Sequence, residues 1–146
     1  MIVLHRELPV LELRDRGGAL VSTWRCKHEH PLVLVFAGTD DSMIEGFADR
    51  IDSYRSANAR VLAVVHAREP GDGEPPGVPF PVLADDGAAT RQYVGAAPAT
   101  VVTDAYGVVE GVFSGTPDHE RIIDLVRMLE MRCPECGVPE WPVEAQ

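Results

Sequence analysis

The sequence predicts an α/β fold with a mixed central sheet flanked by helices, and two kinds of segment carry that prediction. Residues 32–36 and 61–65 are apolar at every position and rich in β-branched side chains, which is typical of strands covered on both faces. Between them, the apolar residues of 42–57 recur at the spacing of a helix. A strand, a helix and a second strand in this order form a crossover unit, which is parallel and right-handed in nearly all known proteins.

Further elements are expected on both sides of this unit. Segments 8–13 and 19–24 alternate apolar and polar residues around a Gly-Gly turn, which predicts an N-terminal β-hairpin. After the second central strand, a short helix is expected to end near Tyr93. Segments 99–103 and 108–114 flank a turn that contains glycine, so they predict an antiparallel pair of strands.

The last helix and the longest loop have their own local signals. Thr116 can cap a helix in which Pro117 takes the first position. The buried face of this helix is expected to consist of Ile122, Ile123, Leu125, Val126 and Leu129. Residues 69–81 contain five prolines and three glycines, a density that predicts a surface loop.

The composition limits the classes of protein to which the chain can belong. Its 146 residues are 45% hydrophobic, which predicts one folded domain. We assign this domain to residues 1–132 and a C-terminal tail to residues 133–146. The longest apolar run, residues 31–38, is less than half of the roughly 20 residues of a membrane-spanning helix, so no membrane partner is expected. The net charge of −10 argues against nucleic acid, because phosphate contacts need clustered Lys and Arg. Residues 1–16 lack the features of a signal peptide, so a cytoplasmic location is expected.

Three segments carry a family resemblance: Phe80–Gly87, Tyr93–Gly95 and Pro98–Gly107, which read FPVLADDG, YVG and PATVVTDAYG. Together with the order of elements, they resemble the alkyl hydroperoxide reductase and thiol-specific antioxidant family of peroxiredoxins, over residues 8–131. The resemblance implies a thioredoxin fold, with Pro98 as a cis-proline beside the active site. Dimers are common in this family, so a homodimer is compatible with the resemblance.

The chain departs from this family at the reactive cysteine. In the family, that cysteine lies just after the first central strand, at the start of the following helix, where the helix dipole lowers the pKa of the thiol. In a thioredoxin-like alignment without gaps, Asp41 and Ile44 occupy the two thiol positions, and on the longer peroxiredoxin spacing Glu45 takes the place of the peroxidatic cysteine. An aspartate cannot form a sulfenic acid or a disulfide. Peroxide reduction by the usual route is therefore not expected.

Polar residues at the same edge of the predicted sheet suggest a different kind of site. Asp40 and Asp41 follow the first central strand, His66 ends the second, and Pro98 precedes a third. Ligands of open α/β sheets bind beside the carboxyl ends of the strands. A carboxylate near an imidazole could perform acid–base chemistry or hold a metal. In the alternative reading, the two aspartates cap a helix and His66 is a polar residue that leaves a strand.

All three cysteines lie away from that edge. Cys133 and Cys136 form a C-x-x-C pair followed by glycine, which is the spacing of a zinc knuckle. Cys26, His28 and His30 offer one thiolate and two imidazoles at alternate positions of an extended segment. In the fold that the resemblance implies, the start of the first central strand and the end of the last helix lie at the same edge. We therefore expect a closed structural zinc site with three cysteines and one of the two histidines.

Two alternatives to zinc remain for this C-x-x-C segment. Cys133 and Cys136 could form a reversible disulfide, although they follow the C-terminal end of a helix, where the dipole opposes a thiolate. They could also be reduced structural thiols in the tail.

Two classes of function are compatible with the sequence. The first is a non-enzymatic binding or assembly module stabilised by zinc, whose partner is an unidentified protein or small molecule. The second is a thiol-disulfide oxidoreductase that uses the C-x-x-C pair. Of the remaining candidate residues, His5 and His119 are expected at the surface, and Trp24 and Trp141 are expected to serve in packing.

Overall fold

The strands and helices of the computed structural model follow the predicted order, with one added strand and one predicted helix divided in two. The structure describes residues 2–23, 29–68 and 77–131. The strands are β1 (Glu12–Asp15), β2 (Leu20–Ser22), β3 (Leu32–Gly38), β4 (Arg60–His66), β5 (Val82–Asp85), β6 (Ala99–Thr103) and β7 (Val109–Ser114). The helices are α1 (Asp41–Asp49), α2 (Ile51–Ser56), α3 (Ala88–Tyr93) and α4 (His119–Glu130). The seven strands form one mixed sheet in the order β2-β1-β5-β4-β3-β6-β7, which confirms the predicted fold class.

The two central strands, β3 and β4, are parallel neighbours, as their continuous apolar sequences predict. Leu32 pairs with Arg60 at one end, and Gly38 with Val65 at the other. Strand β6 runs antiparallel on the other side of β3, and β5 runs parallel beside β4. The carboxyl ends of β3, β4 and β5 therefore meet at one edge of the sheet.

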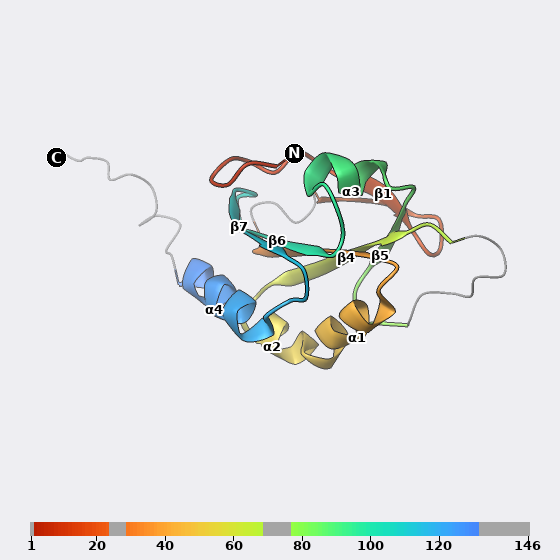
Figure 1. Ribbon diagram of the computed structural model, residues 1–146. Coiled ribbons are helices and arrows are strands. Elements are labelled where there is room, and N and C mark those ends of the chain that lie inside the picture. Colours follow the sequence, from red (N-terminus) through yellow and green to blue (C-terminus); the bar gives the residue numbers. More distant parts are fainter. Residues whose placement is uncertain (1, 24–28, 69–76, 132–146) are drawn as a thin grey trace.

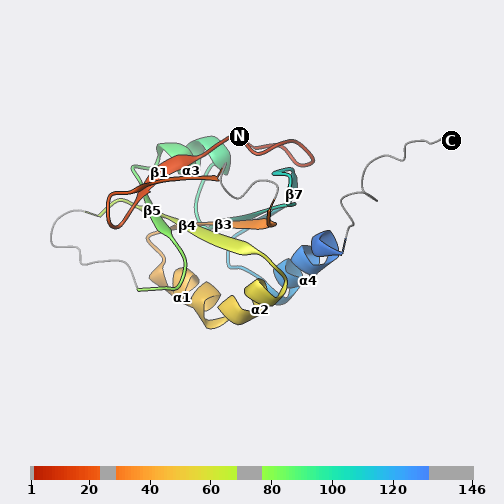
Figure 2. The same ribbon diagram turned by 180° about the vertical axis from the view of Figure 1, so that it is seen from behind.

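The helices form two layers on opposite faces of the sheet (Figures 1 and 2). Helices α1, α2 and α4 cover one face, where they pack on alternate residues of the central strands such as Val33, Val35 and Ala63. Helix α3 covers the other face, together with Leu8 and the intervening strand residues. Because both faces are covered, the central strands have no solvent-facing side, which explains their continuous apolar sequence.

Several boundaries differ from the sequence prediction. The helix expected over 42–57 is two helices, since the chain departs from helical geometry at Arg50, where φ is −110° and ψ is 13°. Asp118, not Thr116, caps the last helix: its side chain accepts a hydrogen bond from the backbone N–H of Arg121. Strand β5 is the addition that the sequence did not predict. The hairpin is confirmed, but its strands are shorter than expected.

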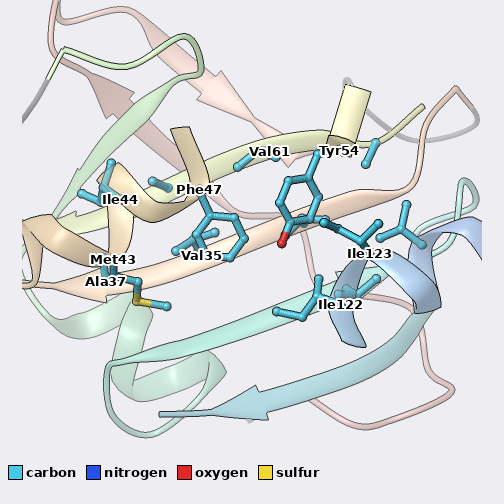
Figure 3. Packing of buried hydrophobic residues seen from close by; sticks show 14 of the residues in the cluster. Val35, Ala37, Met43, Ile44, Phe47, Tyr54, Val61, Ile122 and Ile123 are labelled. Atoms are coloured by element: carbon cyan, nitrogen blue, oxygen red, sulfur yellow. The ribbon is translucent and has the colours of Figure 1, made fainter. Parts of the chain in front are cut away.

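His119 was predicted at the surface, and the structure shows it half-buried between aromatic side chains. Its Nδ1 lies 2.8 Å from the hydroxyl oxygen of Tyr54, within hydrogen-bonding distance. Its ring packs edge-on against Phe47, with 4.5 Å between the ring centroids. Figure 3 shows Phe47 and Tyr54 between the helices and the sheet, close to Ile122 and Ile123 of α4. The histidine therefore joins α4 to α1 and α2. His5, in contrast, is exposed as predicted and lies 3.5 Å from a carboxylate oxygen of Glu110.

The burial of His119 predicts a loss of stability in mild acid. Burial and the nearby charge of Arg50 lower the pKa of His119, while Asp118 acts in the opposite direction with a smaller effect. The unfolded chain then takes up a proton near pH 6.5, before the folded chain does, so stability is full above that pH and declines as the pH falls toward the lowered pKa. Urea unfolding between pH 7.5 and 5 should show a steeper decline for the native chain than for a His119→Gln variant. Parallel curves would contradict this assignment.

No helix among the described residues is both long enough and apolar enough to span a membrane.

Candidate ligand-binding cleft

A hollow of about 490 Å³ lies at the edge where β3 and β4 end. Its walls come from the β3–α1 turn, the end of β4, helix α3 and the loop before β6. Asp40, His66 and Pro98 all line it, as the topological argument predicts. The peptide bond between Ala97 and Pro98 is cis, in agreement with the family resemblance. We call this hollow the cleft.

Gly38 allows the two sides of the cleft to approach each other. Its φ of 62° lies in the left-handed region, which side chains other than glycine adopt at a cost. A Cβ atom at this position would lie 3.0 Å from the Cβ of Ala97. The absence of a side chain therefore lets the loop that carries Pro98 pack against the end of β3.

Asp40 serves as the cap of helix α1. Its Oδ1 accepts hydrogen bonds from the backbone N–H of Met43, at 3.2 Å, and from the hydroxyl of Ser42. These two bonds, with that from Ser42 the stronger influence, lower the pKa of Asp40. The positive end of the helix, where the resemblance to peroxiredoxins would place a thiolate, is thus occupied by a carboxylate that stays ionised at neutral pH.

The two positions that the resemblance aligns with thiols have other roles here. Asp41 accepts a hydrogen bond from Nη2 of Arg68, with which it forms an ion pair, and it is not among the residues that line the cleft. Ile44 is fully buried and belongs to the core between the helices and the sheet. Glu45, the position given by the longer alignment, is exposed. Of the two predicted aspartates, only Asp40 contributes to the cleft.

His66 is exposed at the end of β4 and faces the same cleft as Asp40. Among the contacts of the described residues, no hydrogen bond or ion pair joins His66 to Asp40 or to Asp41. The structure therefore brings the imidazole and the Asp40 carboxylate to one cleft without direct contact between them.

Helix α3 contributes cleft residues that the sequence analysis missed. Buried Asp85 accepts hydrogen bonds from the backbone N–H and the hydroxyl of Thr90, both at 2.9 Å, and from the N–H of Ala89. Burial by itself raises the pKa of Asp85, but these hydrogen bonds outweigh it and the pKa is lowered. The ionised carboxylate fixes the start of α3, and so places Thr90 and Arg91 in the wall of the cleft. The sequence Asp85-Asp86-Gly87 before the helix is the one local pattern that could have indicated how α3 begins.

The similarity of this chain to known proteins lies in its fold. No family model matches it, and no curated protein matches it. Among solved structures, it is similar to the reduced 2-Cys peroxiredoxin of Plasmodium vivax, with a TM-score of 0.70 and 14% identity over 84% of this chain and 79% of that one. The chain has a thioredoxin fold.

Two further structures support the same fold. Peroxiredoxin Q of Xanthomonas campestris matches with a TM-score of 0.69 and 18% identity, over 82% of this chain and 92% of that one. A Neisseria meningitidis protein designated a thioredoxin matches with a TM-score of 0.68 and 20% identity, over 85% of this chain and 90% of that one. The cleft thus lies at the edge of the thioredoxin fold where the resemblance places the active site.

At the opposite edge, a series of hydrogen bonds through Asn58 joins His30, before β3, to Glu130 at the end of α4. Nδ1 of His30 lies 3.1 Å from the backbone oxygen and 3.0 Å from the side-chain oxygen of Asn58. The amide nitrogen of Asn58 in turn donates to Oε1 of Glu130 at 3.1 Å. Because both partners of Nδ1 are oxygens, Nδ1 carries the hydrogen, and a neutral ring then has its lone pair on Nε2.

The other predicted zinc and redox residues cannot be placed in the same way. Cys26, His28, Cys133 and Cys136 lie outside the described residues. Within residues 2–23, 29–68 and 77–131, no group of three or more His, Cys, Asp or Glu side chains could hold a metal ion.

Proposed function

We propose that this thioredoxin-fold protein binds a ligand or partner in the cleft and does not act there as a thiol peroxidase. One observation carries the proposal: of the two positions aligned with thiols, Asp41 is in an ion pair with Arg68 and Ile44 is buried in the core. The cleft itself is retained, with a volume of about 490 Å³. A protein that keeps the cleft without the thiols retains the capacity to bind but lacks the group that exchanges electrons.

The cleft offers both charges and many backbone groups to a ligand. Arg91 of α3 provides the one guanidinium among the lining residues that the structure describes, and Asp40 of the turn between β3 and α1 provides a carboxylate. Gly38, Gly87 and Gly95 place stretches of backbone without side chains in the lining. This lining suits a polar ligand that carries a hydrogen-bond donor at one end and an anionic group at the other.

A structural zinc ion is part of this proposal, with Cys26, Cys133, Cys136 and one histidine as ligands. The position of His30 supports it, because His30 and the end of α4 lie at the same edge through Asn58. Histidine ligands of metals commonly donate their second ring N–H to a carbonyl oxygen, as Nδ1 of His30 does. We therefore favour His30 over His28 as the fourth ligand, through Nε2.

The alternative function is a thiol-disulfide oxidoreductase that uses Cys133 and Cys136. The similarity in fold to thioredoxin and peroxiredoxin structures favours it, whereas the location of the pair after the end of α4 disfavours a stabilised thiolate. Reduction of insulin disulfides in the presence of dithiothreitol distinguishes the two functions. A binding protein should leave the rate at that of dithiothreitol alone. A rate increase that a Cys133→Ser variant abolishes would support the oxidoreductase and overturn the proposal.

A further inference from the structure

A second hollow, of about 240 Å³, lies between the end of α2 and the start of β4 at the edge opposite the cleft. Arg55, Arg60 and His30 line one part of it, and the guanidinium of Arg55 donates to the backbone oxygen of Pro79. The rest of the lining is largely apolar and includes Ile51, Val61, Pro79, Phe80 and Pro81. No carboxylate is among its lining residues in the described part of the chain. We call this hollow the basic groove.

The positive charge of the basic groove contrasts with the negative charge of the chain as a whole. The protein carries a formal net charge of −10, with thirteen Lys and Arg residues against twenty-three Asp and Glu. Two guanidinium groups beside an apolar floor form a site that complements an acidic segment with large apolar side chains.

The segment 132–146 of the same chain has this composition. After Arg132 it contains three glutamates and no Lys or Arg. Its acidic residues are interspersed with large apolar ones, and the sequence from Glu140 to Glu144 reads EWPVE, with Trp141 at its centre. An indole ring provides the largest apolar surface of any side chain, and such rings are the commonest anchors of interfaces.

The end of helix α4, to which this segment is attached, lies next to the basic groove. Helix α4 ends at Glu130, whose carboxylate accepts a hydrogen bond from the amide of Asn58 at 3.1 Å, and Asn58 itself lines the groove. Trp141 lies ten positions after Met131 in the sequence, and an extended chain of ten steps reaches roughly 33 Å. The groove is therefore well within reach. Because the two partners belong to one chain, the effective concentration of the segment at the groove is high.

We propose that residues 132–146 dock in the basic groove, with Trp141 on the apolar floor near Phe80 and the neighbouring glutamates against Arg55 and Arg60. The docking joins the tail to the end of α2 and the start of β4. It depends on apolar and charged contacts of the groove and not on zinc, so it goes beyond the function proposed above.

Trp141 itself reports on the docking. The chain has two tryptophans, so in a Trp24→Phe background the fluorescence comes from Trp141 alone. We expect an emission maximum at shorter wavelength than that of N-acetyltryptophanamide, together with protection from quenching by acrylamide. An added Arg55→Gln and Arg60→Gln pair should shift the emission to longer wavelength and remove the protection. A Glu140→Gln and Glu144→Gln pair, which leaves the described structure untouched, should weaken the protection in the same direction. The control pair, Arg6→Gln with Arg14→Gln, removes the same charge from exposed positions elsewhere and should change neither signal.

Four results would overturn the docking. The first is a Trp141 that is as accessible to acrylamide as the free amide. The second is protection that survives both the arginine and the glutamate pairs, because the tail would then bind elsewhere. The third is protection that disappears on dilution, because the occupant would then be the tail of a second copy. The fourth is protection that a Cys133→Ser and Cys136→Ser variant loses while its groove is intact, because zinc would then hold the tail. In that last case the zinc proposal stands and only the groove proposal fails.

Discussion

Replacing Ile44 by alanine should lower the free energy of unfolding by about 2–5 kcal/mol, measured by urea denaturation. The side chain is fully buried in the core between α1 and the sheet, with Met43, Phe47 and Val35 in the same cluster. Truncation leaves a cavity in addition to the lost transfer free energy, which explains the size of the effect. The position that the family resemblance aligns with a thiol is thus expected to behave as a core residue.

Two variants provide the controls for this experiment. Ile44→Val keeps most of the side chain, so it should cost only about 0.5–1.5 kcal/mol. Asp41→Ala removes an ion pair whose carboxylate side chain is 41% exposed, and exposed pairs contribute about 1 kcal/mol or less. If Ile44→Ala cost no more than Asp41→Ala, the assignment of Ile44 to the core would be wrong.

The second large effect is expected from removal of zinc. Protein prepared in metal-free buffer should contain about one zinc ion per chain, and a Cys133→Ser variant should contain none. If the free zinc concentration is about a thousand times the dissociation constant, binding stabilises the folded state by about 4 kcal/mol. For a chain of this length, chelation would then lower Tm by roughly 10 °C.

Histidine variants test the proposed ligand set. His30→Asn should lose the metal, whereas His28→Asn should retain it, because of the hydrogen bonds that orient the ring of His30. His5→Asn is the matched control, since His5 is exposed and remote from the proposed ligands in the sequence. Elemental analysis that finds no zinc in the native chain would contradict the zinc proposal, whatever the effect of the variants on stability.

The sequence predicted the parts of the fold in which one signal dominates. The central strands were recognised because both of their faces are buried, which leaves no polar position in residues 32–36 or 61–65. The break at Arg50 was missed because Ile51 and Tyr54 continue the helical spacing on the same buried face. Strand β5 was missed because it is only four residues long and follows Pro81 directly. Short strands acquire their conformation from their neighbours, here β4 and β1.

The candidate cleft was predicted only in part. Asp40 and His66 were found because parallel strands end at one edge of the sheet, and a sequence is sufficient for that argument. Arg91 was not found, since its place in the cleft depends on how the buried Asp85 fixes the start of α3. The ion pair of Asp41 with Arg68 spans 27 positions of sequence, and no local pattern indicates it. Interactions over such separations become visible only in the folded chain.

Steady-state consumption of hydrogen peroxide with dithiothreitol as reductant tests the central claim most directly. No thiol is among the described residues that line the cleft, so the native chain should consume peroxide no faster than the same concentration of Cys26→Ser, Cys133→Ser, Cys136→Ser protein. Asp41→Ala should leave that rate unchanged, because Asp41 is held by Arg68 and is not among the residues lining the cleft. Catalytic turnover of peroxide by the native chain, absent from the cysteine-free protein, would contradict the account.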